Sequence, residues 1–320
     1  MINSKISFFS VCTFNKARFI PDNYRSLHKL YKDIKYSVIV PKREIIRFKE
    51  FFKSNNLKDI NIINEEKYIS LIDFKEILLK LSQENNINLK KEDLERIGWY
   101  YQQILKLSFL FVESNNSNFI IMIDSDTILL KKLNLFKDNH SIISYSNYER
   151  NSYYLKSCEY IFKKTFINWK SSTVQLFAIN KKEILFMRDK LENFLSSYRF
   201  KNCSFWLSEI ILKTVLEKYN RIEGSLFSEQ DLLAISNQLN GSRIKEQRIF
   251  IRSNVFGLFN ERQKKFAALL GYEYLTYEEY FLKKENLNFI DLTFILIINY
   301  PFIYNLLKKL KKLTRLSINY

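Results

Sequence analysis

Apolar runs of strand length alternate with segments of helical spacing through residues 1–125 of this chain. Short apolar runs indicate buried strands, and apolar residues that recur every three or four positions indicate helices. Repeated strand and helix units favour a mostly parallel sheet flanked by helices, because parallel neighbours need a long crossover that is usually helical. The sequence therefore predicts the α/β class. The expected strands are 5–12, 36–40, 60–64 and 119–123, and the expected helices are 22–33, 42–54, 66–82 and 99–114.

The alternation loosens after residue 126. A Tyr- and Ser-rich segment covers 143–160, and without an internal repeat or a low-complexity linker we expect residues 1–285 to form one domain. The later elements expected are a strand at 172–179 and helices at 181–197, 203–219, 228–239 and 260–270.

Residues 286–320 form a helical C-terminal extension of different composition, apolar from Leu292 to Leu307 and then rich in lysine. Asn299 and Pro301 interrupt the apolar part, and a spanning helix needs about 20 apolar residues. Two interpretations stay open. The segment 288–315 binds an anionic membrane surface as an interfacial helix, or it packs on the protein core.

The net charge of +17 predicts an anionic partner, such as a phosphorylated small molecule or an acidic membrane surface. Nucleic acid is not expected, because zinc-finger spacing, an arginine-rich helix and an RNP-like aromatic motif are all missing from the sequence. Cys12, Cys158 and Cys203 are too widely spaced for a disulfide framework or a zinc cluster, and no signal peptide is visible. We therefore expect a cytoplasmic protein, peripheral on the inner face of the membrane if its tail binds lipid.

The stretch "FIIMIDSDTILLKKL" places Asp124 and Asp126 directly after an almost wholly apolar run. In an open parallel sheet ligands bind beyond the carboxyl ends of the strands. Strand alternation would direct both carboxylates to one side and Ser125 to the other. Two adjacent carboxylates repel each other unless a cation lies between them, and oxygen ligands select Mg²⁺ or Mn²⁺. The pair predicts a metal site that presents a diphosphate.

The stretch "GWYYQQILKLSFLFVESNNSNFIIMIDSDTILLKKL" (98–133) resembles the core of nucleotide-sugar glycosyltransferases with the Rossmann-like GT-A fold and an Asp-x-Asp motif. It is most similar to a group of uncharacterised bacterial glycosyltransferase-like proteins that carry a Gly-Trp-Tyr-x-Gln-Gln-x-x-Lys-Leu helix before Asp-Ser-Asp-Thr. "FSVCTFNKARF" and "YSVIVPKREIIRF" resemble the opening of that group. The resemblance covers residues 5–135 well and 226–239 less securely.

The resemblance implies a nucleoside-diphosphate sugar donor, a glycan or lipid-linked acceptor, a Mn²⁺ or Mg²⁺ cofactor and a place in bacterial surface-polysaccharide synthesis. Asp126 would bind the metal, and Asp124 would contact the metal or the donor ribose. The other residues implied in donor binding are Thr13, Asn15, Trp99, Gln102, Gln103, Lys106, Ser125 and Gln175. Lys106 would contact phosphate, whereas the two glutamines are equally explained as a buried hydrogen-bonded pair.

An acceptor hydroxyl needs a carboxylate base if the transfer inverts configuration. "SEQDLL" supplies Glu229 and Asp231 as catalytic candidates, although Ser228 followed by acidic residues is also an ordinary helix start. Related enzymes often take a third metal ligand, commonly histidine, from late in the chain. Here the histidines are His28 and His140, and neither lies late.

Two alternatives use the same residues. A phosphatase of the haloacid-dehalogenase type would use Asp124 as nucleophile, but the acidic pair that this chemistry needs downstream is not visible after residue 126. A non-catalytic, basic protein of the membrane surface would carry the aspartates on a solvated turn.

Overall fold

The computed structural model describes residues 6–138, 140–145, 151–167, 169–173, 175–194, 202–222, 225–246, 249–252, 259–269 and 271–277. The expected tail, its membrane-binding segment and the domain boundary at 285 lie outside these residues. Within the described ranges, no helix combines the length and the apolar character that crossing a membrane requires.

A five-stranded sheet in the order β3-β2-β1-β4-β8 forms the centre of the fold. The first four strands of this row are parallel, and β8 pairs antiparallel with β4. The structure therefore confirms the predicted α/β class with a mostly parallel sheet. The strands are β1 (Ile6–Val11), β2 (Lys35–Val40), β3 (Ile60–Asn64), β4 (Phe119–Ile123) and β8 (Leu176–Asn180).

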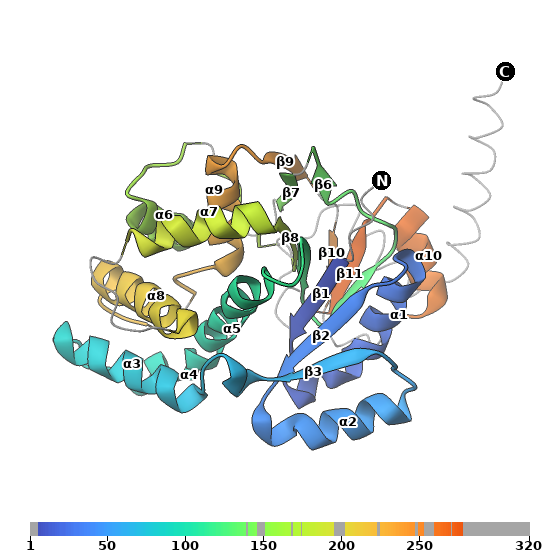
Figure 1. Cartoon of the computed structure of the whole chain (residues 1–320), viewed down its shortest axis with the longest axis horizontal. Helices are drawn as coiled ribbons and strands as arrows, with labels where there is room; N and C mark the ends of the chain where they lie inside the picture. The colour runs from blue at the N-terminus through green and yellow to red at the C-terminus, as the bar shows by residue number, and fades with distance from the viewer. Residues whose placement is uncertain are drawn as a thin grey trace.

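Successive residues of each central strand enter different core clusters. Phe8, Ile121 and Ala178 belong to a cluster formed with α1 and α2, whereas Phe9 and Ile120 belong to a cluster formed with the remaining large helices. This alternation follows from the two-residue period of a strand and shows that both sheet faces are buried. Figure 1 shows the result as helices on both sides of the sheet.

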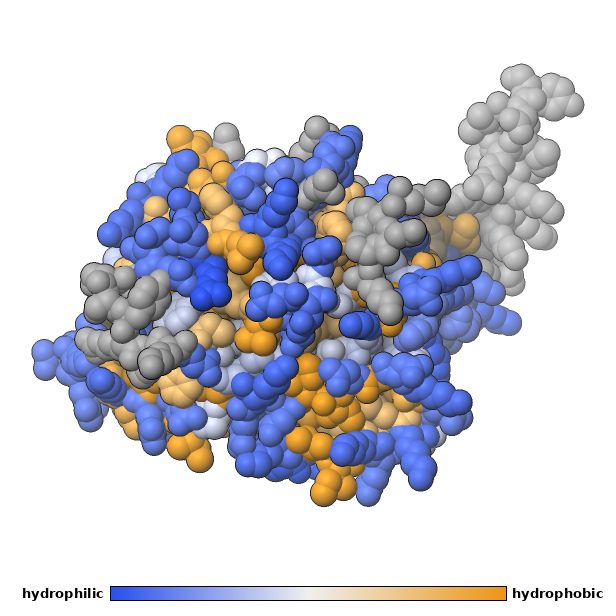
Figure 2. All heavy atoms as spheres, viewed as in Figure 1, coloured by the Kyte–Doolittle hydropathy of each residue, from blue (hydrophilic) through white to orange (hydrophobic). Residues whose placement is uncertain are grey.

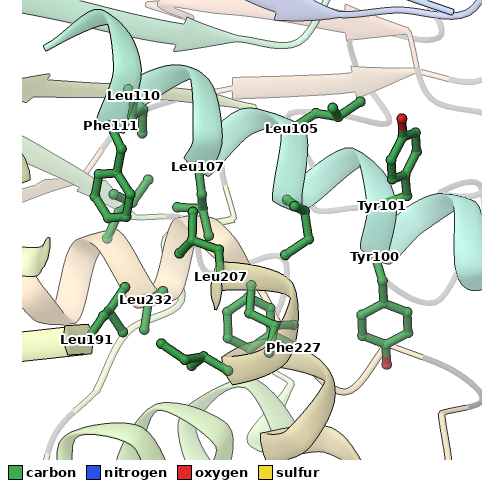
Figure 3. Close-up of a cluster of buried hydrophobic side chains, with 14 of the residues drawn as sticks. Tyr100, Tyr101, Leu105, Leu107, Leu110, Phe111, Leu191, Leu207, Phe227 and Leu232 are labelled. Atoms are coloured by element: carbon green, nitrogen blue, oxygen red, sulfur yellow. The ribbon is translucent and has the colours of Figure 1, made fainter. Parts of the chain in front are cut away.

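Helix α5 (Ile97–Glu113) packs against β1 through the stacked rings of Phe9 and Phe109, whose centroids are 4.0 Å apart. Its residues are buried on nearly every side, as expected of a helix that is apolar all round. Figure 3 shows Tyr100 and Leu107 of this helix directed toward Leu207 and Phe227. The predicted helix at 99–114 is confirmed, and its position between the sheet and other helices fixes the residues on its first two turns.

The remaining helices match their predictions to different degrees. The predicted helix at 66–82 divides into a 3-10 turn and α3, which starts after Ser70 because the Ser70 side chain accepts a hydrogen bond from the Asp73 amide. The helices are α1 (Ile20–Leu30), α2 (Ile45–Ser54), α3 (Leu71–Glu84), α4 (Lys91–Glu95), α6 (Ser152–Phe162), α7 (Lys181–Glu192), α8 (Cys203–Tyr219), α9 (Glu229–Leu239) and α10 (Glu261–Leu269), with 3-10 turns at Phe14–Phe19, Lys42–Glu44 and Glu65–Lys67.

Two smaller sheets were not predicted. One has the order β10-β11-β5 and the other β6-β7-β9. Their strands are β5 (Thr127–Leu129), β6 (Phe136–Lys137), β7 (His140–Tyr145), β9 (Arg243–Glu246), β10 (Ile249–Arg252) and β11 (Tyr274–Tyr277). Because β5 directly follows the aspartates, its pairing with β11 holds that segment from outside the central sheet. In the view of Figure 2, hydrophilic residues cover most of the surface and the apolar patches are separate.

Candidate active site

A cavity of about 650 Å³ opens at the carboxyl ends of the parallel strands. The chain places β2 and β3 on one side of β1 and β4 on the other, so the strand order reverses between β1 and β4. Such a switch point leaves a crevice beyond the strand ends, where open α/β sheets bind their ligands. Residues after β1 and β4, the first turns of α5 and the start of α9 line the cavity. Its size suits a small-molecule ligand.

Asp124 and Asp126 both line this cavity. Strand β4 ends at Ile123, and the Thr127 amide donates to the Asp124 carbonyl at 3.0 Å, so residues 124–127 form a turn rather than more strand. Ser125 also lines the cavity, but it is 6 % exposed and thus buried between the two partly exposed aspartates.

Neighbouring elements hold the turn at 124–127 from several sides. The Asp124 amide donates to the Gln175 carbonyl, and the Tyr277 amide donates to the Asp126 carbonyl. The Asn23 side-chain amide, fully buried on α1, donates to the Thr127 carbonyl at 2.6 Å. The two carboxylates thus sit on a backbone that is fixed before any ligand arrives, which is the condition for a preorganised site.

Lys106 connects the aspartates to α9. Its Nζ lies 2.8 Å from Oδ1 of Asp124 and 2.8 Å from Oε1 of Glu229. Burial alone lowers the pKa of a lysine, but the two carboxylates more than offset it, and the pKa of Lys106 is raised above its ordinary value. Lys106 is therefore charged. The sequence predicted that it contacts phosphate, and in the structure its ammonium group binds two carboxylates of the protein.

Most of the predicted donor-binding side chains meet in the cavity. Those that line it are Thr13, Asn15, Trp99, Gln102, Lys106, Asp124, Ser125 and Gln175. Gln103 is 2 % exposed, is not among the lining residues that the structure describes, and accepts a hydrogen bond from the Glu229 amide at 2.8 Å. These contacts favour the alternative given for the glutamines, in which the side chain is buried and hydrogen-bonded within the protein. The hydrogen bond of Gln103 joins α5 to α9.

Gln175 precedes β8, although the strand predicted at 172–179 included it. Its backbone has a φ of 58°, in the left-handed region that a non-glycine residue seldom adopts. The side chain is 5 % exposed, and its Oε1, buried at the cavity, has no hydrogen-bond partner among the residues that the structure describes. A strained backbone and an unsatisfied buried oxygen together indicate a ligand contact.

Glu229 and Asp231 have different surroundings. Glu229 lines the cavity and pairs with Lys106. Asp231 is fully buried, and its Oδ1 accepts a hydrogen bond from the Ser172 amide at 2.7 Å. The backbone amide of Asp231 donates to the side chain of Ser228, which caps the helix. These contacts favour the helix-start interpretation for Asp231, and they leave Glu229 as the carboxylate that faces the cavity.

Asp124 and Asp126 supply hard oxygen donors of the kind that Mg²⁺ and Mn²⁺ prefer. In the part of the chain that the structure describes, no group of three or more His, Cys, Asp and Glu residues is arranged to hold a metal. Two carboxylates do fit Mg²⁺, which usually takes one or two from the protein and the rest from water and substrate phosphates. The donor set fits a metal that arrives with a diphosphate and does not fit a closed structural metal site.

Neither histidine is among the described lining residues. The His28 ring packs on Tyr24, with ring centroids 4.0 Å apart, and burial lowers its pKa. Nδ1 of His140 lies 3.9 Å from Glu183. The third metal ligand, commonly a histidine in the enzymes that the sequence resembles, therefore has no candidate among these two residues.

Other lining residues were given no role from the sequence. Arg96, Gly98, Tyr154 and Ser225 extend the cavity along the start of α5. Cys12 also lines the cavity but is 3 % exposed, and burial raises the pKa of its thiol to about 12. These residues were not assigned to the site from the sequence, because they come from elements far apart in the chain.

A family model described as "Family of unknown function (DUF6492)" matches residues 23–290. No curated protein matches the sequence significantly.

Solved structures with similar folds include a galactosyltransferase LgtC bound to donor and acceptor sugar analogues, at 12 % identity and a TM-score of 0.43, covering 85 % of this chain and 86 % of that one. An active-site mutant of LgtC matches at 10 % identity and a TM-score of 0.45, covering 92 % and 95 %. Mouse xyloside xylosyltransferase 1 in its apo form matches at 10 % identity and a TM-score of 0.39, covering 85 % and 97 %. Similarity this distant carries no argument about the chemistry of this chain.

Proposed function

This chain belongs to the DUF6492 family, a family of unknown function, and we propose that it is a metal-dependent glycosyltransferase using a nucleoside-diphosphate sugar. One observation carries the proposal. Asp124, Asp126, Lys106 and Glu229 meet in a single cavity at the switch point of a mostly parallel sheet. The sequence resemblance to GT-A enzymes with an Asp-x-Asp motif supports the same assignment.

The donor nucleotide is proposed to lie beyond the ends of β1 to β3, with its diphosphate reaching Asp124 and Asp126. Thr13 and Asn15 are exposed side chains directly after β1 and supply hydroxyl and amide groups for ribose and base. With the donor in this position, the Oε1 of Gln175 accepts a hydrogen bond from a hydroxyl of the donor sugar.

Asp124 and Asp126 would hold Mn²⁺ or Mg²⁺ together with the diphosphate, and the bound ion would neutralise the charge that develops on the departing nucleotide. The protein itself supplies the positioning. Lys106 fixes the Asp124 carboxylate from one side and the Glu229 carboxylate from the other. This holds the two carboxylates close together in a fixed orientation, because the charge of the lysine between them offsets their mutual repulsion.

Sugar transfer forms a bond from the acceptor hydroxyl oxygen to the anomeric carbon of the donor. The bond from that carbon to the diphosphate oxygen breaks, and the nucleoside diphosphate leaves with the electron pair. The hydroxyl proton passes to a carboxylate, and Glu229 is the proposed base because it faces the cavity. We propose a glycan or glycolipid acceptor in bacterial surface-polysaccharide assembly at the cytoplasmic membrane face, from the resemblance alone.

Calorimetry with UDP and GDP, with and without Mn²⁺, tests this function. The native protein should bind one of them only when Mn²⁺ is present, and chelating the metal should abolish the binding. Asp126→Asn should weaken metal-dependent binding at least tenfold, which is about 1.4 kcal/mol. Asp33→Asn is the matched control, because Asp33 is exposed, lies away from the cavity and has a φ of 54° that asparagine tolerates.

The alternatives give different results in the same samples. A phosphatase would release inorganic phosphate from a phosphate ester and lose that activity in Asp124→Asn. A non-catalytic surface protein would show neither metal-dependent nucleotide binding nor phosphate release. Nucleotide binding that is equal with and without metal, or unaffected by Asp126→Asn, would refute the glycosyltransferase assignment.

A further inference from the structure

The cavity continues past the aspartates along the first turns of α5. Trp99 and Lys106 both line it, and seven residues of helix separate them, a distance of about 10 Å along the axis. Lys106 contacts Asp124, so the Trp99 end lies roughly two helical turns from the proposed diphosphate position. The end at Trp99 is thus remote from the aspartates yet open to the same cavity.

The chemistry of this end differs from that of the strand ends. The Trp99 ring is partly exposed, the Arg96 guanidinium lies 5.7 Å from its centroid, and the nearly parallel Tyr154 ring lies 6.3 Å away. Arg96 also donates to Ser225 Oγ at 2.9 Å, and Asn151 donates to the Ser225 carbonyl at 2.7 Å. An aromatic surface thus lies beside hydrogen-bonding groups that other contacts hold in place.

Gly98 leaves room at the same end. It lines the cavity, and a Cβ built on it would meet no atom within 4 Å. A glycine inside a helix costs about 1 kcal/mol relative to alanine. Packing within the protein does not require the glycine here, since a side chain would enter open space. The space in front of Gly98 is therefore available to a ligand.

We propose that the acceptor is a carbohydrate whose sugar ring stacks on Trp99, beside Arg96 and Gly98. This inference rests on the proposed function. A pyranose presents one face of C–H groups that packs on an aromatic ring and a rim of hydroxyls that need polar partners. Trp99 supplies the aromatic ring for the C–H face. Arg96, Gln102 and Ser225 supply the polar partners for the hydroxyls. The inference assigns Trp99 to the acceptor and not, as the resemblance implied, to the donor.

The orientation follows from the two ends of the cavity. With the diphosphate at Asp124 and Asp126, the donor sugar lies near Gln175 and Glu229, all of which line the cavity. An acceptor ring at Trp99 then reaches the donor from the side of α5, and Glu229, which lines the same cavity, serves as the base. A further ring of a longer glycan continues past Gly98 toward solvent, because Gly98 is exposed.

Saturation-transfer NMR on the full chain tests the acceptor site, with methyl glucoside, methyl galactoside and methyl mannoside as probes. The samples contain UDP or GDP with Mg²⁺, because Mn²⁺ is paramagnetic and broadens the signals. At least one probe should receive saturation, chiefly at the C–H protons of one ring face. Trp99→Ala should reduce that signal at least tenfold, and Trp99→Phe should retain most of it. Gly98→Leu should also remove it, since the new side chain fills the open space.

Nucleotide calorimetry on the same variants separates this inference from the proposed function. Trp99→Ala and Gly98→Leu should bind the metal-bound nucleotide within about twofold of native affinity, and their unfolding midpoints should show that they are folded. If Trp99→Ala weakens nucleotide binding instead, Trp99 belongs to the donor and the inference fails. Equal probe signals in native and Trp99→Ala, or no probe signal while nucleotide binds, also overturn it. Loss of all nucleotide binding in the native protein refutes the proposed function itself.

Discussion

The ammonium group of Lys106 lies 2.8 Å from the carboxylate of Asp124, inside a cavity wall where the lysine is 5 % exposed. The same ammonium contacts Glu229 at the same distance. A buried charge of this kind is stable only with its partners in place. The contact therefore ties the conformation of the proposed metal site to the position of α9.

Lys106→Met should destabilise the folded protein by about 3–5 kcal/mol, because it leaves the buried Glu229 and the partly buried Asp124 without their counter-charge. Denaturant unfolding measures this difference. Lys67→Met is the matched control, since Lys67 pairs with Glu113 at 3.0 Å but its side chain is 50 % exposed. An exposed pair is worth less than about 1 kcal/mol. Equal effects of the two substitutions would contradict the role given to Lys106.

Glu229→Gln and Asp231→Asn separate the two catalytic candidates. Glu229→Gln should lower turnover by about 10²-fold or more with little change in nucleotide affinity, because a glutamine accepts no proton. Asp231→Asn should mainly lower the unfolding midpoint, since Asp231 accepts hydrogen bonds from Ser171, Ser172 and Thr173. Kinetics on variants verified as folded decide the point. The assignment of the base is wrong if Asp231→Asn alone stops turnover.

Gly98→Ala should stabilise the protein by about 1 kcal/mol, because alanine is the better helix former and its Cβ meets nothing. Gly241→Ala is the control: its Cβ also meets nothing, but its φ is +85°, where an alanine is strained. That substitution should therefore destabilise. Thermal unfolding of both variants measures the change in stability, which should have opposite signs. A destabilised Gly98→Ala would contradict a helical Gly98 with open space around it.

Cys12 should resist alkylation in the folded protein. Its pKa of about 12 means that thiolate appears only as the pH rises toward that value. At pH 8 the thiolate fraction is about 10⁻⁴, so iodoacetamide should react about 10³-fold more slowly than with an ordinary cysteine. Mass spectrometry of native and urea-unfolded protein measures the two rates. Rapid labelling of Cys12 in the native state would show that the thiol is not buried.

The central strands were predictable because burial on both sheet faces produces continuous apolar runs, as in "FIIMI" before Asp124. Helix α6 was missed within the Tyr- and Ser-rich segment. Its buried positions are Tyr154, Ser157, Cys158 and Ile161, which have helical spacing, but small and polar residues occupy two of them. A count of apolar residues does not detect such a face. Strands β5 and β11 were missed because each is short and their pairing joins residues far apart in sequence.

The site was predictable where one element carried it. Asp124 and Asp126 follow a recognisable strand, whereas the pairing of Lys106 with Glu229 joins residues 123 positions apart. The resemblance implied donor contacts for both Gln102 and Gln103, yet the Gln103 side chain accepts a hydrogen bond from the start of α9. The side chain that ends up in a cavity depends on tertiary packing, which a helical period alone does not fix.

The hydroxyls of Thr127 and Thr276, 149 positions apart in the sequence, are hydrogen-bonded at 2.7 Å beside the amide of Tyr277 that holds Asp126. A polypeptide emerging from the ribosome makes its aspartate turn early and receives the strand that secures it late. Contacts of such long sequence separation form slowly, and only after the intervening chain has been made. A nascent chain that has not yet extruded Tyr277 therefore lacks the contact that secures the candidate active site, however much of its sheet has already assembled.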